Sequence, residues 1–327
     1  MAVSNLRSVS LTIGMAAFIG SAFIGLGTIG GCSGDPNPSA STAGSASGTG
    51  GSATASSASG DSSSGSGGAG ASTSASASSS GSGGSGVTGS PGCGKAPSVE
   101  TGKFVYEDMM VGGATRKYAI RFPNEYDPKK PYPLVMLFHG CGGIDNNVPI
   151  EKESKNDAVL VKGAAMASCW DTALDSPDLA FFDELLTLVE DRACIDSSRV
   201  FGVGYSSGSW LLNVLGCVRA GVVRAQGNVS GGLPFVQNCE GNIAGIFLHD
   251  KDDKSNGIQG GINARDRLLT VNGCGMGTVP LDPAPCVQYE GCQAGYPVAW
   301  CQTSGKDHSR QDDFAPGAFW KFFSSLP

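Results

Sequence analysis

A serine between two glycines is the first feature of this sequence that could do chemistry. The segment Gly204-Tyr205-Ser206-Ser207-Gly208 follows the run "RVFGV" and directly precedes the helical pattern "SWLLNVLG". A strand, then G-x-S-x-G, then a helix predicts a sharp turn that exposes the Ser206 hydroxyl at the carboxyl edge of a sheet. An ordinary Gly/Ser turn is the alternative. The flanking strand and helix favour a nucleophilic serine, which would attack a carbonyl carbon.

A nucleophilic serine needs a base and an acid, and two further segments fit these roles. In the chain order serine, acid, histidine, His308 is the histidine that lies far enough downstream, in a polar loop before the last predicted helix. The acidic loop "HDKDDKSN" lies between Ser206 and His308. We predict that Asp253 is the acid, with Asp252 as the reserve. A lone surface histidine and a solvated acidic loop are the alternatives.

A glycine-rich turn upstream could stabilise the negative charge that such an attack creates. The segment "LFHGCGG" ends a predicted strand and can point backbone N–H groups at the reacting carbonyl. We predict that the oxyanion is held by the N–H of Cys141 and by that of Ser207, at the start of the helix after the nucleophile. His139 precedes Ser206 in the chain and is expected to organise this turn. These residues imply no cofactor and no metal.

The elements that must position these residues alternate between strands and helices. Short apolar or alternating runs predict strands at "RKYAIRF", "YPLVMLFHG", "RVFGVG", "AGIFLHD" and "YPVAWC". Apolar residues recur at helical spacing in "DLAFFDELLTLVEDRA", "SWLLNVLGCV" and "PGAFWKFF". This alternation predicts an α/β sandwich in which helices flank a mostly parallel central sheet.

Composition divides the chain into three parts. Residues 1–31 carry one charge and a long apolar stretch, and "IGGC" follows, so we predict a lipoprotein-type signal peptide with Cys32 as the lipidated residue. Residues 32–92 are almost entirely Ser, Gly, Ala and Thr, which predicts a flexible linker. Residues 93–327 are long enough to bury a core and form the predicted catalytic domain. We expect an outer-membrane or cell-surface lipoprotein; a membrane-spanning anchor and ordinary secretion are the alternatives.

Cysteine content and charge exclude several classes of function. Of the eleven cysteines, Cys32 would carry the lipid, and the even number that is left predicts up to five disulfides in an exported domain. The pairing stays open, and the last four cysteines could pair with one another in three ways. Zinc is the alternative, but no CxxC pair occurs. The net charge is −7 without a basic cluster, so we expect no nucleic-acid partner. We expect a monomer that meets the membrane only through its lipid.

Several longer segments resemble the secreted feruloyl esterase and polyhydroxybutyrate depolymerase superfamily, carbohydrate esterase family one in its broad sense. The resemblance covers about residues 104–323 and rests on "LFHGCGG", "CWDT", "DLAFFDELL", "CIDSSRVFGVGYSSGS", "VSGG", "FLHDKDD" and "CVQYEGCQAGYPVAWC". It implies an α/β-hydrolase fold with Ser206 as nucleophile, Asp253 as acid and His308 as base.

Three departures from the family pattern bear on the shape of the loops. Asp250 stands where the family usually has glycine, Ser209 replaces a common second glycine, and "KDH" replaces "GGH" before the histidine. None of the three removes a catalytic group.

The resemblance implies a serine carboxylic ester hydrolase, with feruloyl esterase as the first choice. Such an enzyme would release hydroxycinnamates from plant cell-wall polysaccharide. Polyhydroxybutyrate depolymerase and acetylxylan esterase are the alternatives for the substrate. A different class is an inactive, surface-anchored binding protein on the same fold, because a fold does not establish a function. The presence of Ser206, Asp253 and His308 together favours the enzyme.

Overall fold

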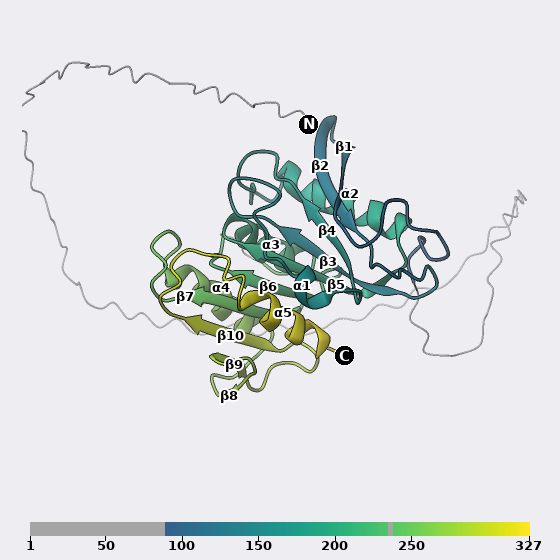
Figure 1. The fold of residues 1–327 in the computed structure, drawn as a ribbon. Helices are drawn as coiled ribbons and strands as arrows, with labels where there is room; N and C mark the ends of the chain where they lie inside the picture. The colour runs from purple at the N-terminus through teal and green to yellow at the C-terminus, as the bar shows by residue number, and fades with distance from the viewer. Residues whose placement is uncertain (1–88, 235–237) are drawn as a thin grey trace, which may run out of the picture. The chain divides into compact units, whose positions relative to one another are not determined.

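The computed structural model describes residues 89–234 and 238–327 (Figure 1). The predicted signal peptide, the predicted lipidation site Cys32 and the predicted linker up to residue 88 lie outside the described residues.

The described domain includes the last residues of the predicted linker. Gly89 forms an antiparallel β-bridge with Asp196. The hydroxyl of buried Ser90 donates to the carbonyl of Ala193 at 2.6 Å and accepts the N–H of Ile195 at 2.8 Å. These contacts attach the chain to the domain a few residues ahead of the expected boundary.

One mixed sheet forms the centre of the domain (Figure 1). Its strands lie in the order β1-β2-β4-β3-β5-β6-β7-β10-β9-β8. The run from β4 to β10 is parallel, and the pairs outside it are antiparallel. The predicted α/β fold with a mostly parallel central sheet is therefore confirmed. The strands are β1 (Val105–Val111), β2 (Ala114–Arg121), β3 (Tyr132–Phe138), β4 (Val159–Gly163), β5 (Ile195–Tyr205), β6 (Ala225–Val229), β7 (Ala244–Asp250), β8 (Thr278–Pro280), β9 (Cys286–Tyr289) and β10 (Val298–Thr303).

Helices cover both faces of this sheet, because its central strands are apolar on both sides. Along β3, Leu134 and Met136 join one hydrophobic cluster, whereas Val135 and Leu137 join the other. Helices α2, α3 and α4 contribute to the first cluster, and α5 contributes to the second. Among the described residues no helix is both long and apolar enough to cross a membrane. The helices are α1 (Glu151–Ser154), α2 (Pro177–Arg192), α3 (Ser207–Val218), α4 (Ile258–Val271) and α5 (Ala315–Ser324).

Five disulfides join the cysteines of the domain, as predicted from their even number. The structure also decides the pairing that the sequence left open in the late cluster. The bonds are Cys93–Cys194, Cys141–Cys169, Cys217–Cys239, Cys274–Cys292 and Cys286–Cys301.

Two glycines allow β5, α3 and β3 to meet closely at the serine motif. A Cβ atom on Gly204 would lie 2.6 Å from the carbonyl oxygen of Gly208. A Cβ atom on Gly208 would overlap the carbonyl group of Phe138, at the end of β3, and approach the carbonyl oxygen of His139 to 2.8 Å. The small residues of the motif are therefore needed because backbones touch on both sides of Ser206.

We expect Gly208→Ala to lower the free energy of unfolding by about 1–3 kcal/mol, because the added methyl group must push β3 and α3 apart. Gly317→Ala is the matched control, since a Cβ atom at this position of α5 meets nothing within 4 Å. The control should be stabilised by roughly 0.5–1 kcal/mol through helix propensity. Urea unfolding with the disulfides intact measures both values. Equal stability of the two variants would contradict the close packing.

Candidate active site

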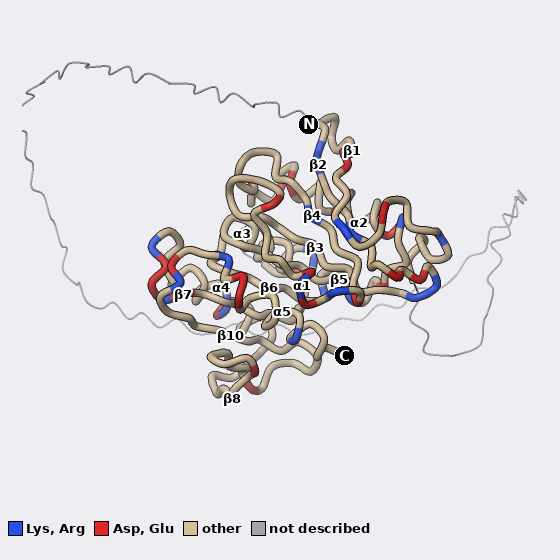
Figure 2. Tube along the Cα trace, in the orientation of Figure 1, with Lys and Arg blue, Asp and Glu red and all other residues tan. Residues whose placement is uncertain are grey.

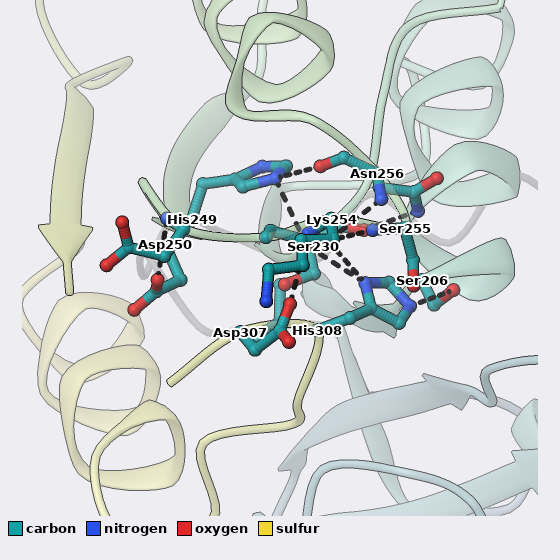
Figure 3. Close-up of polar contacts among 12 residues, drawn as sticks. Ser206, Ser230, His249, Asp250, Lys254, Ser255, Asn256, Asp307 and His308 are labelled. Carbon is teal, nitrogen blue, oxygen red and sulfur yellow. Dashed lines mark hydrogen bonds and ion pairs between the residues drawn. The ribbon is translucent and has the colours of Figure 1, made fainter. Parts of the chain in front are cut away.

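Ser206 lies at the corner where β5 ends and α3 begins. Its backbone has φ 50° and ψ −116°, a conformation that residues with side chains rarely adopt. The N–H of Ser206 donates to the carbonyl of Val229, at the end of β6, at 2.9 Å. The neighbouring strand thus holds the strained turn, and the side chain points toward His308 (Figure 3).

Ser209, where the family pattern has glycine, links the same corner to β6. Its side chain is fully buried, and its hydroxyl accepts the N–H of Val229 at 3.0 Å. The hydroxyl also lies 2.7 Å from the carbonyl oxygen of Gly204. This departure from the pattern therefore adds a polar contact beneath Ser206 and leaves the turn intact.

The structure brings Ser206, His308 and Asp253 into one hydrogen-bonded chain (Figure 3). Nε2 of His308 lies 2.9 Å from Oγ of Ser206. Nδ1 of the same ring lies 2.9 Å from Oδ2 and 3.1 Å from Oδ1 of Asp253. With the proton on Nδ1, the ring donates to the carboxylate, and Nε2 is free to accept the proton of the serine. The hydroxyl of Tyr205 donates to the carbonyl of His308 at 3.2 Å.

Asp253 is buried and surrounded by donors. Its Oδ1 accepts the N–H of Ser255 at 2.9 Å and that of Asn256 at 2.8 Å. Burial alone would raise the pKa of the Asp253 carboxyl, but the hydrogen bonds from His308 and from the N–H of Asn256 outweigh it and hold this pKa below its ordinary value. The carboxylate therefore stays ionised beside the histidine.

Asp252, the reserve prediction for the acid, lies away from the histidine. Its side chain is 46% exposed, and its carboxylate accepts hydrogen bonds from Lys251 Nζ at 3.0 Å and from the N–H of Gly305 at 2.9 Å. The geometry thus distinguishes the two neighbouring acids and places Asp253 against the ring of His308.

His249 is a supporting residue that the sequence reasoning missed. It is buried at the end of β7, and its Nε2 lies 2.6 Å from the carbonyl oxygen of Asn256 and 3.3 Å from Oδ2 of Asp253. Burial lowers the pKa of His249, so the ring is neutral and donates from Nε2. The sequence feature that could have indicated this role is a histidine at the end of an apolar strand, four residues before the predicted acid.

The predicted oxyanion residues Cys141 and Ser207 lie on two segments that contact each other. Ser207 begins α3, so its N–H belongs to the first turn, where backbone donors lack partners within the helix. Cys141 follows β3 and is bonded to Cys169. Among the hydrogen bonds of the described residues, none uses the N–H of Cys141. Neither N–H has a hydrogen-bond partner among the described residues, so the oxyanion role of Cys141 and Ser207 stays a prediction.

Trp170 connects these two segments, and the sequence reasoning gave it no such role. Its backbone N–H donates to Oγ of Ser207 at 2.8 Å, and its indole Nε1 donates to the carbonyl of His139 at 3.0 Å. The adjacent disulfide of Cys169 adds a covalent link to the loop after β3. The segment "CWDT" is the sequence feature that could have indicated this role of Trp170.

His139 is buried in the loop after β3, as expected for a residue that organises it. Its Nδ1 lies 2.6 Å from the carbonyl oxygen of Gly140, and its Nε2 accepts the N–H of Ala165 at 3.0 Å. Burial lowers the pKa of His139, which keeps the ring neutral. The ring therefore links its own loop to the segment that follows β4.

The arrangement as a whole has the parts needed for acyl transfer. It has a hydroxyl beside an imidazole nitrogen, a carboxylate that fixes the ring, and backbone donors without an intramolecular partner at a helix start. Within residues 89–234 and 238–327, no group of three or more His, Cys, Asp or Glu side chains is arranged to hold a metal ion.

Two named esterases are similar in sequence to this chain. Feruloyl esterase D of Neurospora crassa is 31% identical over 266 residues, which cover 72% of this chain and 90% of that protein. Feruloyl esterase C of Emericella nidulans is 28% identical over 256 residues, which cover 72% of this chain and 90% of that protein. No protein-family model matches the chain.

A solved structure supports the fold. The acetyl xylan esterase of Aspergillus awamori superposes with a TM-score of 0.51 at 14% identity, over 63% of this chain and 94% of that one. From the two sequence relatives, which this chain matches over nine-tenths of their length, we conclude that it belongs to the feruloyl esterase family and is a carboxylic ester hydrolase with an α/β-hydrolase fold.

Proposed function

We propose that this protein is an exported serine esterase that releases hydroxycinnamates such as ferulate from plant cell-wall polysaccharide. The observation that carries the proposal is the contact of 2.9 Å between Nε2 of His308 and Oγ of Ser206, with Nδ1 of the same ring held by Asp253. The acyl group is inferred from the two relatives named feruloyl esterase.

The proposed reaction begins with proton transfer from Ser206 to Nε2 of His308. The serine oxygen attacks the ester carbonyl carbon, and the N–H groups of Ser207 and Cys141 hold the resulting oxyanion. The ester C–O bond then breaks, and His308 returns the proton to the leaving alcohol oxygen. Water, deprotonated by the same ring, attacks the acyl-enzyme; the bond between the acyl carbon and Oγ of Ser206 breaks, His308 returns the proton to Oγ, and the acid is released. Asp253 stabilises the imidazolium in both halves of the reaction.

Export is part of the proposal and is supported by the disulfides. Five disulfides in one domain are typical of proteins that fold in an oxidising compartment. The lipid on Cys32 and the linker of residues 32–92 would hold the domain at the membrane surface while leaving it free to reach polymer fragments.

Hydrolysis of methyl ferulate by the oxidised full-length protein tests the reaction. We expect Ser206→Ala to lower kcat/KM by roughly 10⁶-fold, because it removes the nucleophile, and Asp253→Asn by roughly 10⁴-fold, because the ring of His308 is then no longer held in the right tautomer. Asp252→Asn, the neighbouring matched change, should cost less than about tenfold, since its side chain does not touch the ring.

The outcomes separate the alternatives. Activity on acetyl or hydroxybutyrate esters without activity on methyl ferulate would contradict the feruloyl assignment. If the folded wild type hydrolyses none of the three classes of ester, the proposal of an enzyme is contradicted and the alternative of a binding protein is favoured.

Fractionation of cells that make the full chain tests the lipid anchor. We expect the wild type in the membrane fraction and Cys32→Ala in the soluble fraction, because the variant lacks the sulfur that carries the lipid. Immunoblots of both fractions measure the distribution. Cys93, which forms a disulfide with Cys194, is left intact in both forms. Identical partition of the two forms would contradict lipidation.

A further inference from the structure

The acid and the base of the proposed triad come from two separate loops that leave adjacent strands. Strands β7 and β10 are parallel, and their last residues, Asp250 and Thr303, are partners in the register. Asp253 follows β7 and His308 follows β10. The distance between the two side chains therefore depends on what joins the two loops.

Asp250 is the buried side chain that joins them. It has no exposed surface, and its Oδ1 accepts the N–H of Asp252, in its own loop, at 2.8 Å. Its Oδ2 accepts the hydroxyl of Thr303, the last residue of β10, and the N–H of Lys306 in the loop that follows, each at 3.0 Å. A buried carboxylate is stable only where hydrogen bonds replace its water, and here three donors, one from the end of β10 and one from each loop, do so.

The other contacts between these loops are backbone bonds or lie at the surface. The N–H of Lys251 donates to the carbonyl of Thr303 at 3.0 Å. The N–H of Lys254 donates to Oδ1 of Asp307 at 3.0 Å (Figure 3). Asp307 is exposed, and basic and acidic residues lie near one another at the end of β7 (Figure 2). Water and salt weaken such exposed contacts more than they weaken the buried bonds of Asp250.

The loop before His308 needs such support because it is strained. Asp307 has φ 50°, in the region that side chains rarely adopt, and Gly305 has φ 73°. The bond from Lys306 to Asp250 lies between these two residues. Local strain at a site persists only where the surroundings hold the backbone in place.

We propose that Asp250 is a positioning residue, which holds the loop of His308 in register with the loop of Asp253 and so sets the geometry of the triad. This inference rests on the proposed function of Ser206, His308 and Asp253. Asp250 contacts neither Ser206 nor His308 in the hydrogen bonds of the described residues, so it acts through Thr303 and Lys306.

Steady-state kinetics of the oxidised full-length protein on an ester that the wild type hydrolyses tests the proposal. We expect Asp250→Ala to lower kcat by roughly 10- to 100-fold and to change KM by less than about threefold, because a small displacement of the base slows the chemical step. Asp250→Asn keeps one acceptor oxygen and should recover part of kcat. Thr303→Val, which removes only one donor, should cost roughly three- to tenfold.

Asp196→Ala is the matched control for the loss of a buried carboxylate. Asp196 is 7% exposed and accepts the N–H of Ser198, at the opposite end of β5 from Ser206. This variant should lose stability while its kcat stays within about twofold of the wild type. If Asp250→Ala behaves in the same way, the positioning role is contradicted.

Two further measurements separate positioning from simple destabilisation. The effects of Asp250→Ala and Thr303→Val on kcat should be non-additive, because both act through one contact; additive effects would contradict the proposal. The low-field proton resonance of His308 Nδ1–H should broaden or shift in Asp250→Ala and stay unchanged in Asp196→Ala. An unchanged resonance in both variants would overturn the proposal.

The resonance also distinguishes the failure of this inference from failure of the proposed function. If the wild type hydrolyses no ester, the proposed function fails, but a resonance that depends on Asp250 would still support the positioning of His308. If the wild type is active and Asp250→Ala keeps its full kcat, the proposed function stands and this inference fails.

Discussion

Parallel pairing of β5, β6, β7 and β10 places the carboxyl ends of these strands at one edge of the sheet, and the whole site depends on that alignment. Ser206 and His308 are 102 residues apart in the chain, yet Oγ and Nε2 lie 2.9 Å apart. A parallel sheet needs crossover connections, which α3 and α4 supply while they cover one face. The edge that results is where ligands bind in open α/β sheets.

Contacts around this edge hold the reacting groups from two sides. On one side, Trp170 and the disulfide of Cys141 fix the loop after β3 against the start of α3. On the other side, Asp250 fixes the loop of the base against the loop of the acid. Two buried histidines, His139 and His249, serve as neutral hydrogen-bonding residues in these supports. The polar groups that surround the triad are therefore largely committed to holding loops in place.

The sequence predicted most of the elements whose apolar pattern is strong, although β4, with the apolar and buried sequence "VLVKG", was missed. Strands β2, β3, β5, β7 and β10 and helices α2, α3 and α5 are confirmed at the predicted segments. Strand β6, with the sequence "AQGNV", was missed because Gln226 and Asn228 are polar and yet buried. Helix α4 was missed because it contains two adjacent glycines and few apolar residues. Strand β8 is short and exposed, so its sequence carries no burial signal.

In the active site too, the sequence predicted some residues and missed others that depend on tertiary contacts. The G-x-S-x-G motif and chain order pointed to Ser206, His308 and Asp253, which the structure brings within hydrogen-bond distance. The disulfide pairing could not be predicted, because cysteine spacing allows several connectivities. The supports at Asp250 and Trp170 could not be predicted either, because each joins segments that only the fold brings together.

Trapping of the acyl-enzyme tests the central claim most directly. The oxidised protein would be mixed with a slowly deacylating aryl ester, quenched in acid, digested and analysed by mass spectrometry. The proposed mechanism predicts that the peptide that contains Ser206 gains the mass of the acyl group, and that the modification disappears as the free acid is released. Turnover with an unmodified Ser206 peptide, or with the acyl group on another residue, would contradict nucleophilic catalysis by Ser206.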